Sequence, residues 1–142
     1  MIIMGHPKKQ RKKHETPKKP YDRSRLEREK RVKDNFGLRR KKEIWRAESI
    51  LRQFRHRARE LQAHRNEKEE AILLGTLTKL GISCQRLEDV LETNLDDILS
   101  RRLQTIVHKK GFSNTIRQSR QIIVHGHVSL AGKKITYPSY IV

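Results

Sequence analysis

The chain has 142 residues and a formal net charge of +18, with 34 lysines and arginines against 16 aspartates and glutamates. No apolar run approaches the roughly 18 residues of a membrane-spanning helix. The single cysteine, Cys84, excludes an internal disulfide and any all-cysteine zinc site. Such an excess of cations indicates an anionic partner, and nucleic acid is the leading candidate.

Charge is distributed unevenly along the chain. Residues 1–59 carry 22 basic and 7 acidic side chains, residues 71–100 carry 2 and 5, and residues 101–142 carry 8 and none. We therefore expect an α+β fold in three parts: a basic extended arm over 1–21, a mostly helical domain over 22–94, and a small module of two helices and a β-hairpin over 95–142.

The arm is too charged and too rich in proline to build a core. Pro7, Pro17 and Pro20 block helix continuation. The cations between them repel one another unless phosphates intervene, so we expect an arm that becomes ordered on an RNA backbone. The alternative is a solvated or nuclear-import-like tail. The expected phosphate contacts are Lys8, Lys9, Arg11, Lys12 and Lys13.

A weak, polar helix is predicted over 22–36, with Asp22 as its N-cap and Gly37 as its stop. Four consecutive cations follow this helix and are predicted to bind phosphate, with a solvated linker as the alternative. They are Arg39, Arg40, Lys41 and Lys42.

Residues 43–64 carry the strongest helical periodicity. The apolar stripe consists of Ala47, Ile50, Leu51, Phe54, Ala58 and Leu61. Arginines flank this stripe and suit bidentate phosphate contact, and those expected to bind RNA are Arg46, Arg55, Arg57 and Arg59. Trp45 lies off the stripe, where it either stacks on a base or an arginine, or is partly buried for structural reasons.

A second helix is predicted over 67–80 and should pack against the first as a hairpin. Cys84 follows and is expected to be a small buried hydrophobe rather than a nucleophile. Five acids over 88–97 resemble a metal or acid–base site. Helix chemistry explains part of the set more simply, because Asn94 and Asp97 have the spacing of a capping box.

The last 42 residues are predicted to form a compact module. One helix is expected over 95–110, a second over 115–125, and a hairpin with a tight turn at 131–133. Residues in this module that are expected to contact RNA are Arg101, Arg102, Lys109, Lys110, Arg117, Gln118, Arg120, Gln121, His125, His127 and Lys133. The two histidines lack a clear third ligand, so we expect backbone or RNA contacts rather than a metal.

Five stretches of the C-terminal part resemble the RNA-binding module named after small-subunit ribosomal protein four. They are RRLQTIV at 101–107, KKGF at 109–112, TIRQSRQIIVHGHV at 115–128, AGK at 131–133 and PSY at 138–140. The N-terminal stretches PKKQRKK at 7–13, KEIWR at 42–46 and FRHRAR at 54–59 resemble the archaeal and eukaryotic form of that ribosomal protein itself. The resemblance thus covers nearly the whole chain.

This resemblance implies a structural constituent of the small ribosomal subunit. It implies binding to a junction in the 5′ domain of small-subunit ribosomal RNA, nucleation of assembly, and a contribution to decoding accuracy near the mRNA entrance. Neighbouring ribosomal proteins and nearby mRNA are the other expected partners. We expect a cytoplasmic location on the ribosome, no membrane partner and no obligate homo-oligomer.

No metal or other cofactor is expected, because the cysteine zinc cluster of some bacterial relatives has no counterpart in the N-terminal part. Relatives usually continue beyond the segment that matches 138–142, which leaves truncation of the module at its C-terminus open. Contacts of a C-terminal tail are therefore not assigned.

Other functions compete with this interpretation. A DNA-binding helix-turn-helix fits the two short helices but not the hairpin and the long arm. An enzyme is not expected, because no nucleophile–base pair, phosphate loop or metal constellation stands out in the sequence. The closest alternatives are a paralogue in a small-nucleolar particle that acts in ribosome biogenesis, and a stand-alone RNA-binding protein.

Overall fold

The computed structural model describes residues 12–142, so the predicted contacts Lys8, Lys9 and Arg11 lie outside the described residues. The described residues form seven helices and one two-stranded antiparallel hairpin, which confirms the α+β fold. The elements are α1 (Arg23–Asn35), α2 (Lys41–Ala63), α3 (Glu67–Lys79), α4 (Leu87–Glu92), α5 (Leu95–Ser100), α6 (Leu103–Lys109), α7 (Ile116–Val124), β1 (Ser129–Leu130) and β2 (Lys133–Lys134). None of these helices is long and apolar enough to cross a membrane.

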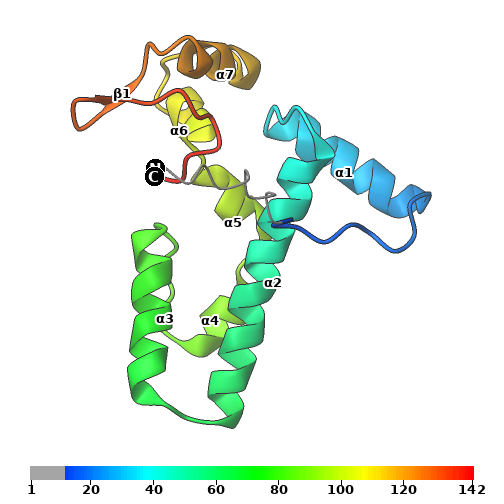
Figure 1. The fold of residues 1–142 in the computed structure, drawn as a ribbon, viewed down its shortest axis with the longest axis vertical. Coiled ribbons are helices and arrows are strands. Elements are labelled where there is room, and N and C mark those ends of the chain that lie inside the picture. The colour runs from blue at the N-terminus through cyan, green and yellow to red at the C-terminus, as the bar shows by residue number, and fades with distance from the viewer. Residues whose placement is uncertain (1–11) are drawn as a thin grey trace, which may run out of the picture.

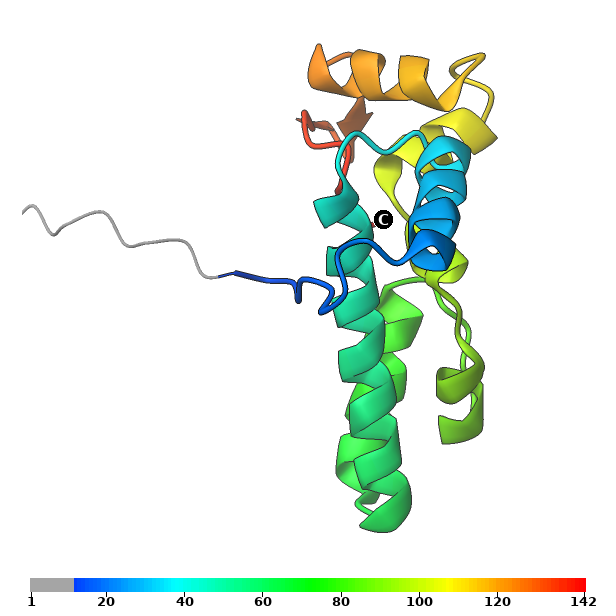
Figure 2. The same ribbon diagram turned by 90° about the vertical axis from the view of Figure 1, so that its right-hand side faces the viewer.

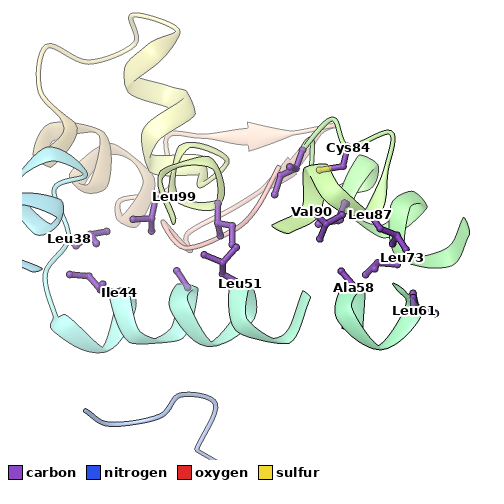
Figure 3. Packing of buried hydrophobic residues seen from close by; sticks show 14 residues of the cluster. Leu38, Ile44, Leu51, Ala58, Leu61, Leu73, Cys84, Leu87, Val90 and Leu99 are labelled. Atoms are coloured by element: carbon purple, nitrogen blue, oxygen red, sulfur yellow. The ribbon is translucent and has the colours of Figure 1, made fainter. Parts of the chain in front are cut away.

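Helix α2 is the central element of the larger part, and α1, α3, α4 and α5 pack along it (Figure 1). The predicted apolar stripe faces these neighbours, with Ala47, Leu51, Ala58 and Leu61 buried (Figure 3). Ile50 and Phe54 are half-buried against the same core. Each fully buried leucine contributes about 1.5–3 kcal/mol to stability, so this stripe holds the helices together.

Helices α2 and α3 form the predicted hairpin. After α3 the chain turns back at Gly81, whose φ is +72°. Cys84 is buried beside Leu87 and Val90, as predicted for a small hydrophobe (Figure 3). Acids in this region cap helices. The Asp89 carboxylate accepts from two N–H groups before α4, and the Asp97 carboxylate accepts from Asn94 N at 2.7 Å.

The single helix predicted over 95–110 is wrong, because the chain breaks between α5 and α6. The C-terminal segment pairs with this break: Arg102 forms an antiparallel bridge with Ile141, and Leu103 N donates to Tyr140 O at 2.7 Å. Arg102 itself is extended, with φ −68° and ψ 139°. The helical spacing of apolar residues continues through the break and does not predict it. Pairing with residues 140–141 explains why the helix is interrupted there.

A second, smaller core lies under α6, α7 and the hairpin, with Leu103, Val107 and Ile123 buried. Residues Ala131 and Gly132 have φ of 47° and 78°, so both central turn positions are left-handed, as tight hairpin turns require. The strands are shorter than predicted: β1 pairs with β2 over only two residues each, and Tyr137 remains 71% exposed. Figure 2 shows α7 lying across one end of the molecule, beyond the N-terminal end of α2.

Candidate nucleic-acid interface

The described part of the arm lies against α2, as the dark blue segment in Figure 1 shows. Glu15 N donates to Ser49 Oγ at 3.2 Å, and the Glu15 carboxylate pairs with Arg52. The predicted contacts Lys12 and Lys13 are exposed beside this attachment. Lys12 and Lys13 are therefore held close to a point where the chain is fixed to α2.

Trp45 has the structural role that was one of its two predicted alternatives. Its indole N–H donates to Glu29 Oε1 at 2.9 Å and thereby joins α2 to α1. Glu29 is 4% exposed and also pairs with Arg25 and, at 3.4 Å, with Lys41. Burial works to raise the pKa of Glu29, but the hydrogen bonds from Trp45, Arg25 and Lys41 outweigh it and lower the pKa, so the carboxylate stays charged.

The predicted cationic run at 39–42 is exposed at the start of α2. Lys41 is engaged by Glu29, whereas the side chains of Arg39, Arg40 and Lys42 form no ion pair within residues 12–142. The main chain of this run is fixed by Glu43, whose Oε1 accepts from Arg39 N and Arg40 N at 3.3 Å each. Three cations are thus available to phosphate on an ordered backbone.

Glu43 also joins α2 to the C-terminal module. Its Oε2 lies 2.5 Å from Arg102 Nη2 and 3.5 Å from Arg120 Nη1. Burial works to raise the pKa of Glu43, but the charges of Arg102 and Arg120 and the hydrogen bonds outweigh it and lower the pKa. Residues 101–142 contain no acid, so their compensating charge comes from Glu43 of α2 and from Asp34 of α1, which lies 3.8 Å from Arg117.

This pairing changes the role of one predicted RNA contact. Arg102 is only 7% exposed, and its guanidinium forms an ion pair with Glu43. The structure therefore places this side chain inside the protein rather than on a phosphate-binding surface. Arg120 is partly exposed and keeps a face toward solvent. Charge counting within residues 101–142 could not reveal the distant carboxylate.

Gln104 is a second connection that the sequence reasoning missed. The side chain is fully buried, and its Nε2 donates to Gly37 O at 3.0 Å and to Ile116 O at 3.1 Å. Its Oε1 lies 3.5 Å from Arg120 Nη1. The one available signal was a polar residue at an apolar position of a helix, which a buried hydrogen-bonding role explains.

The predicted arginines of α2 divide into two groups. Arg55 is half-buried and its Nη2 donates to Thr93 O at 2.6 Å, which fastens α2 to the end of α4. Arg57 is exposed and lies 3.9 Å from Glu69. Arg46 and Arg59 are exposed and form no ion pair within the described residues. Arg46 and Arg59 therefore remain the better candidates for phosphate.

Most predicted contacts of the module lie on its surface. Besides Arg102 and the partly exposed Arg120, Arg101 is an exception, because its guanidinium donates to Val142 O at 2.8 and 3.1 Å. His125 and His127 stack with ring centroids 6.4 Å apart, and no cluster of three metal-type ligands occurs within residues 12–142. The exposed residues are Lys109, Lys110, Arg117, Gln118, Gln121, His125, His127 and Lys133.

Cations of the larger part and of the module lie together near the start of α2, where Arg40, Lys42 and Arg46 line the same groove as Arg102 and Arg120. A rigid array of this kind neutralises several phosphates and fixes the orientation of a folded nucleic acid. Most acids of α3, α4 and α5 cap helices or face solvent, whereas Glu69 of α3 lies 3.9 Å from Arg57.

Comparisons with known proteins show which family the chain resembles. A family model described as the S4 domain matches residues 101–142. Small ribosomal subunit protein uS4 of Methanothermobacter thermautotrophicus is 46% identical over 144 aligned residues, covering 98% of this chain and 84% of the relative. The proteins of the same name from Hyperthermus butylicus and Saccharolobus solfataricus are each 49% identical, over 98% of this chain and 82% and 80% of their own lengths.

The names of these relatives describe a ribosomal protein, in agreement with the prediction that the chain is not an enzyme. Identity of this level over nearly the full length leaves one conclusion. The chain belongs to the family of small ribosomal subunit protein uS4.

Proposed function

We propose that this chain is a structural constituent of the small ribosomal subunit and binds small-subunit ribosomal RNA. The observation that carries the proposal is the connected cationic surface, in which Glu43 holds the module against α2. Family membership supports the same role, since the relatives are named as proteins of the small ribosomal subunit.

Different features of the protein determine how tightly it binds RNA and in which orientation. Exposed lysines and arginines release counterions from phosphates and supply most of the affinity. The fixed angle between α2 and the module selects an RNA whose helices present phosphates at matching positions, because folded RNA is recognised mainly by shape. Direct base contacts are expected only where the RNA is unpaired.

The finer role follows from the resemblance. The RNA site is a multi-helix junction in the 5′ domain, and binding there helps to start assembly of the subunit. The protein then lies near the mRNA entrance, next to other small-subunit proteins, and affects decoding accuracy. It forms no obligate homo-oligomer and acts on cytoplasmic ribosomes. Its chain consists of a basic arm over 1–21, a helical RNA-binding domain over 22–94 and an RNA-binding module over 95–142.

Sedimentation tests the ribosomal role against the biogenesis alternative. Tagged chain is expressed in a host with related ribosomes, and gradient fractions are probed for the tag. Mature small subunits should carry the tag. A tag confined to precursor particles would contradict the proposal and favour the small-nucleolar paralogue, and a tag in neither would favour a stand-alone RNA-binding protein.

A further inference from the structure

A groove of about 1020 Å³ runs between the arm, α2 and the C-terminal module. Its lining includes residues 12–14 of the arm, the first turns of α2, the end of α5 and residues 138–141. Its size lies at the upper end of the range for small-ligand pockets. The groove is therefore the concave part of the cationic surface described above.

The groove is strongly cationic. Seven lysines and arginines line it, against the single carboxylate of Glu43. Arg102 and Arg120 share that carboxylate. The other five cations form no ion pair within residues 12–142, and they are Lys12, Lys13, Arg40, Lys42 and Arg46. An anion in the groove would meet a positive charge that the protein does not neutralise.

Aliphatic side chains form the rest of the lining. Ile98 and Leu99 are buried, whereas Ile50, Pro138 and Ile141 are half-buried and keep part of their surface in the groove. The backbone of an RNA duplex would press charged phosphates toward this apolar surface and gain nothing from it. A planar base would cover it and remove it from water.

We propose that this groove binds an unpaired nucleotide of single-stranded RNA. The base lies on Ile50, Pro138 and Ile141, and the flanking phosphates meet Lys42 and Arg46. The inference rests on the proposed function and adds a base-dependent site to a surface that otherwise reads phosphates and shape. An acidic peptide would satisfy the cations but leave the aliphatic surface uncovered, so the combined lining favours RNA.

The first experiment changes the ligand and leaves the protein intact. The full chain is titrated with single-stranded oligouridine of about eight nucleotides, and with an abasic ribose-phosphate chain of equal length and charge. The base-containing chain should bind about tenfold more tightly, because the aliphatic side chains remove part of the base from water. Equal affinities would overturn the proposal, because phosphates alone would then account for binding.

The second experiment uses a matched pair of variants. Arg46→Gln removes a groove cation, and Arg65→Gln removes an exposed cation from the turn at the far end of α2. Thiouridine in the same oligonucleotide should crosslink to residue 50 or to residues 138–141 in the wild type and in Arg65→Gln, with a strong loss in Arg46→Gln. Crosslinks at other residues, or an equal loss of crosslinking in both variants, would contradict the proposal. Displacement of the RNA by oligoglutamate of equal charge would also contradict it.

Binding to a fragment of small-subunit ribosomal RNA distinguishes failure of the groove site from failure of the proposed function. If the chain binds the fragment but shows no base dependence in the groove, this inference fails and the proposed function stands. If the chain does not bind the fragment either, the proposed function fails.

Discussion

At the scale of the residue, Glu43 joins the start of α2 to the C-terminal module and so sets the geometry of the cationic surface. It fixes the start of α2 through two main-chain N–H groups and draws Arg102 and Arg120 of the module toward the same helix. The partners are 59 and 77 residues away in sequence. The negative Glu43 carboxylate thus supports RNA binding, although RNA is also negative, because it positions the arginines.

Glu43→Gln should therefore weaken RNA binding, although it raises the net charge by one. The change leaves the buried Arg102 without its counter-charge, which should lower the free energy of unfolding by about 3 kcal/mol. Glu48→Gln is the control, since Glu48 is half-buried on the same helix and forms no ion pair within residues 12–142. Filter binding to ribosomal RNA that shows tighter binding for Glu43→Gln would mean that charge alone matters.

Acid should destabilise the wild type through the same carboxylate. The pKa of Glu43 is lower in the folded chain than its ordinary value, so the folded state gives up the proton more readily than the unfolded state. The stability that Glu43 supplies is present above the ordinary pKa and is lost as pH falls below about 4.3 and through the lower folded pKa. Urea unfolding across this range should show a shallower pH dependence for Glu43→Gln, and parallel curves would contradict the account.

Gln104→Leu should destabilise the protein by about 2–4 kcal/mol, because it leaves the carbonyls of Gly37 and Ile116 without their buried donor. Gln62→Leu on the exposed face of α2 should change stability by less than about 0.5 kcal/mol. Thermal and denaturant unfolding measure both changes. Equal small effects would show that the Gln104 hydrogen bonds do not hold the module in place.

At the scale of the element, two glycines should respond to alanine with opposite signs. Gly37 has φ +57°, and an added Cβ would lie 2.8 Å from Ile116 Cγ2 across the contact between the larger part and the module. Gly75 lies inside α3 with open space around it. Gly37→Ala should cost about 2–3 kcal/mol, and Gly75→Ala should add about 0.5–1 kcal/mol. If the unfolding curves of both variants shifted in the same direction, Gly37 would not lie in a close contact between the larger part and the module.

Elements that depend on local residues could be predicted from the sequence, whereas elements that depend on distant contacts could not. The stripe of α2, the stop at Gly37 and the Asn94–Asp97 cap depend on residues within a few turns, so local spacing predicted them. The break between α5 and α6 depends on a strand segment near residue 141, and the role of Arg102 depends on Glu43. The cations of the site were predictable from composition, whereas the carboxylate and amide that orient them were not, because both come from long-range packing.

At the scale of the whole molecule, function depends on two properties that separate experimentally. A net charge of +18 supplies affinity for any RNA. With about six to ten phosphate contacts, that affinity should fall about 10³–10⁵-fold between about 50 and 200 mM salt. The connection between α2 and the module supplies preference for one folded shape, and salt weakens this preference much less.

The most direct measurement is binding of the full chain to the isolated 5′ domain of small-subunit ribosomal RNA, with excess tRNA as competitor, across a salt series. We expect tight binding that survives the tRNA and a preference for the 5′ domain that persists as salt rises. Binding that tRNA erases as readily as the 5′ domain itself would show a polycation without shape selection, and would contradict the account.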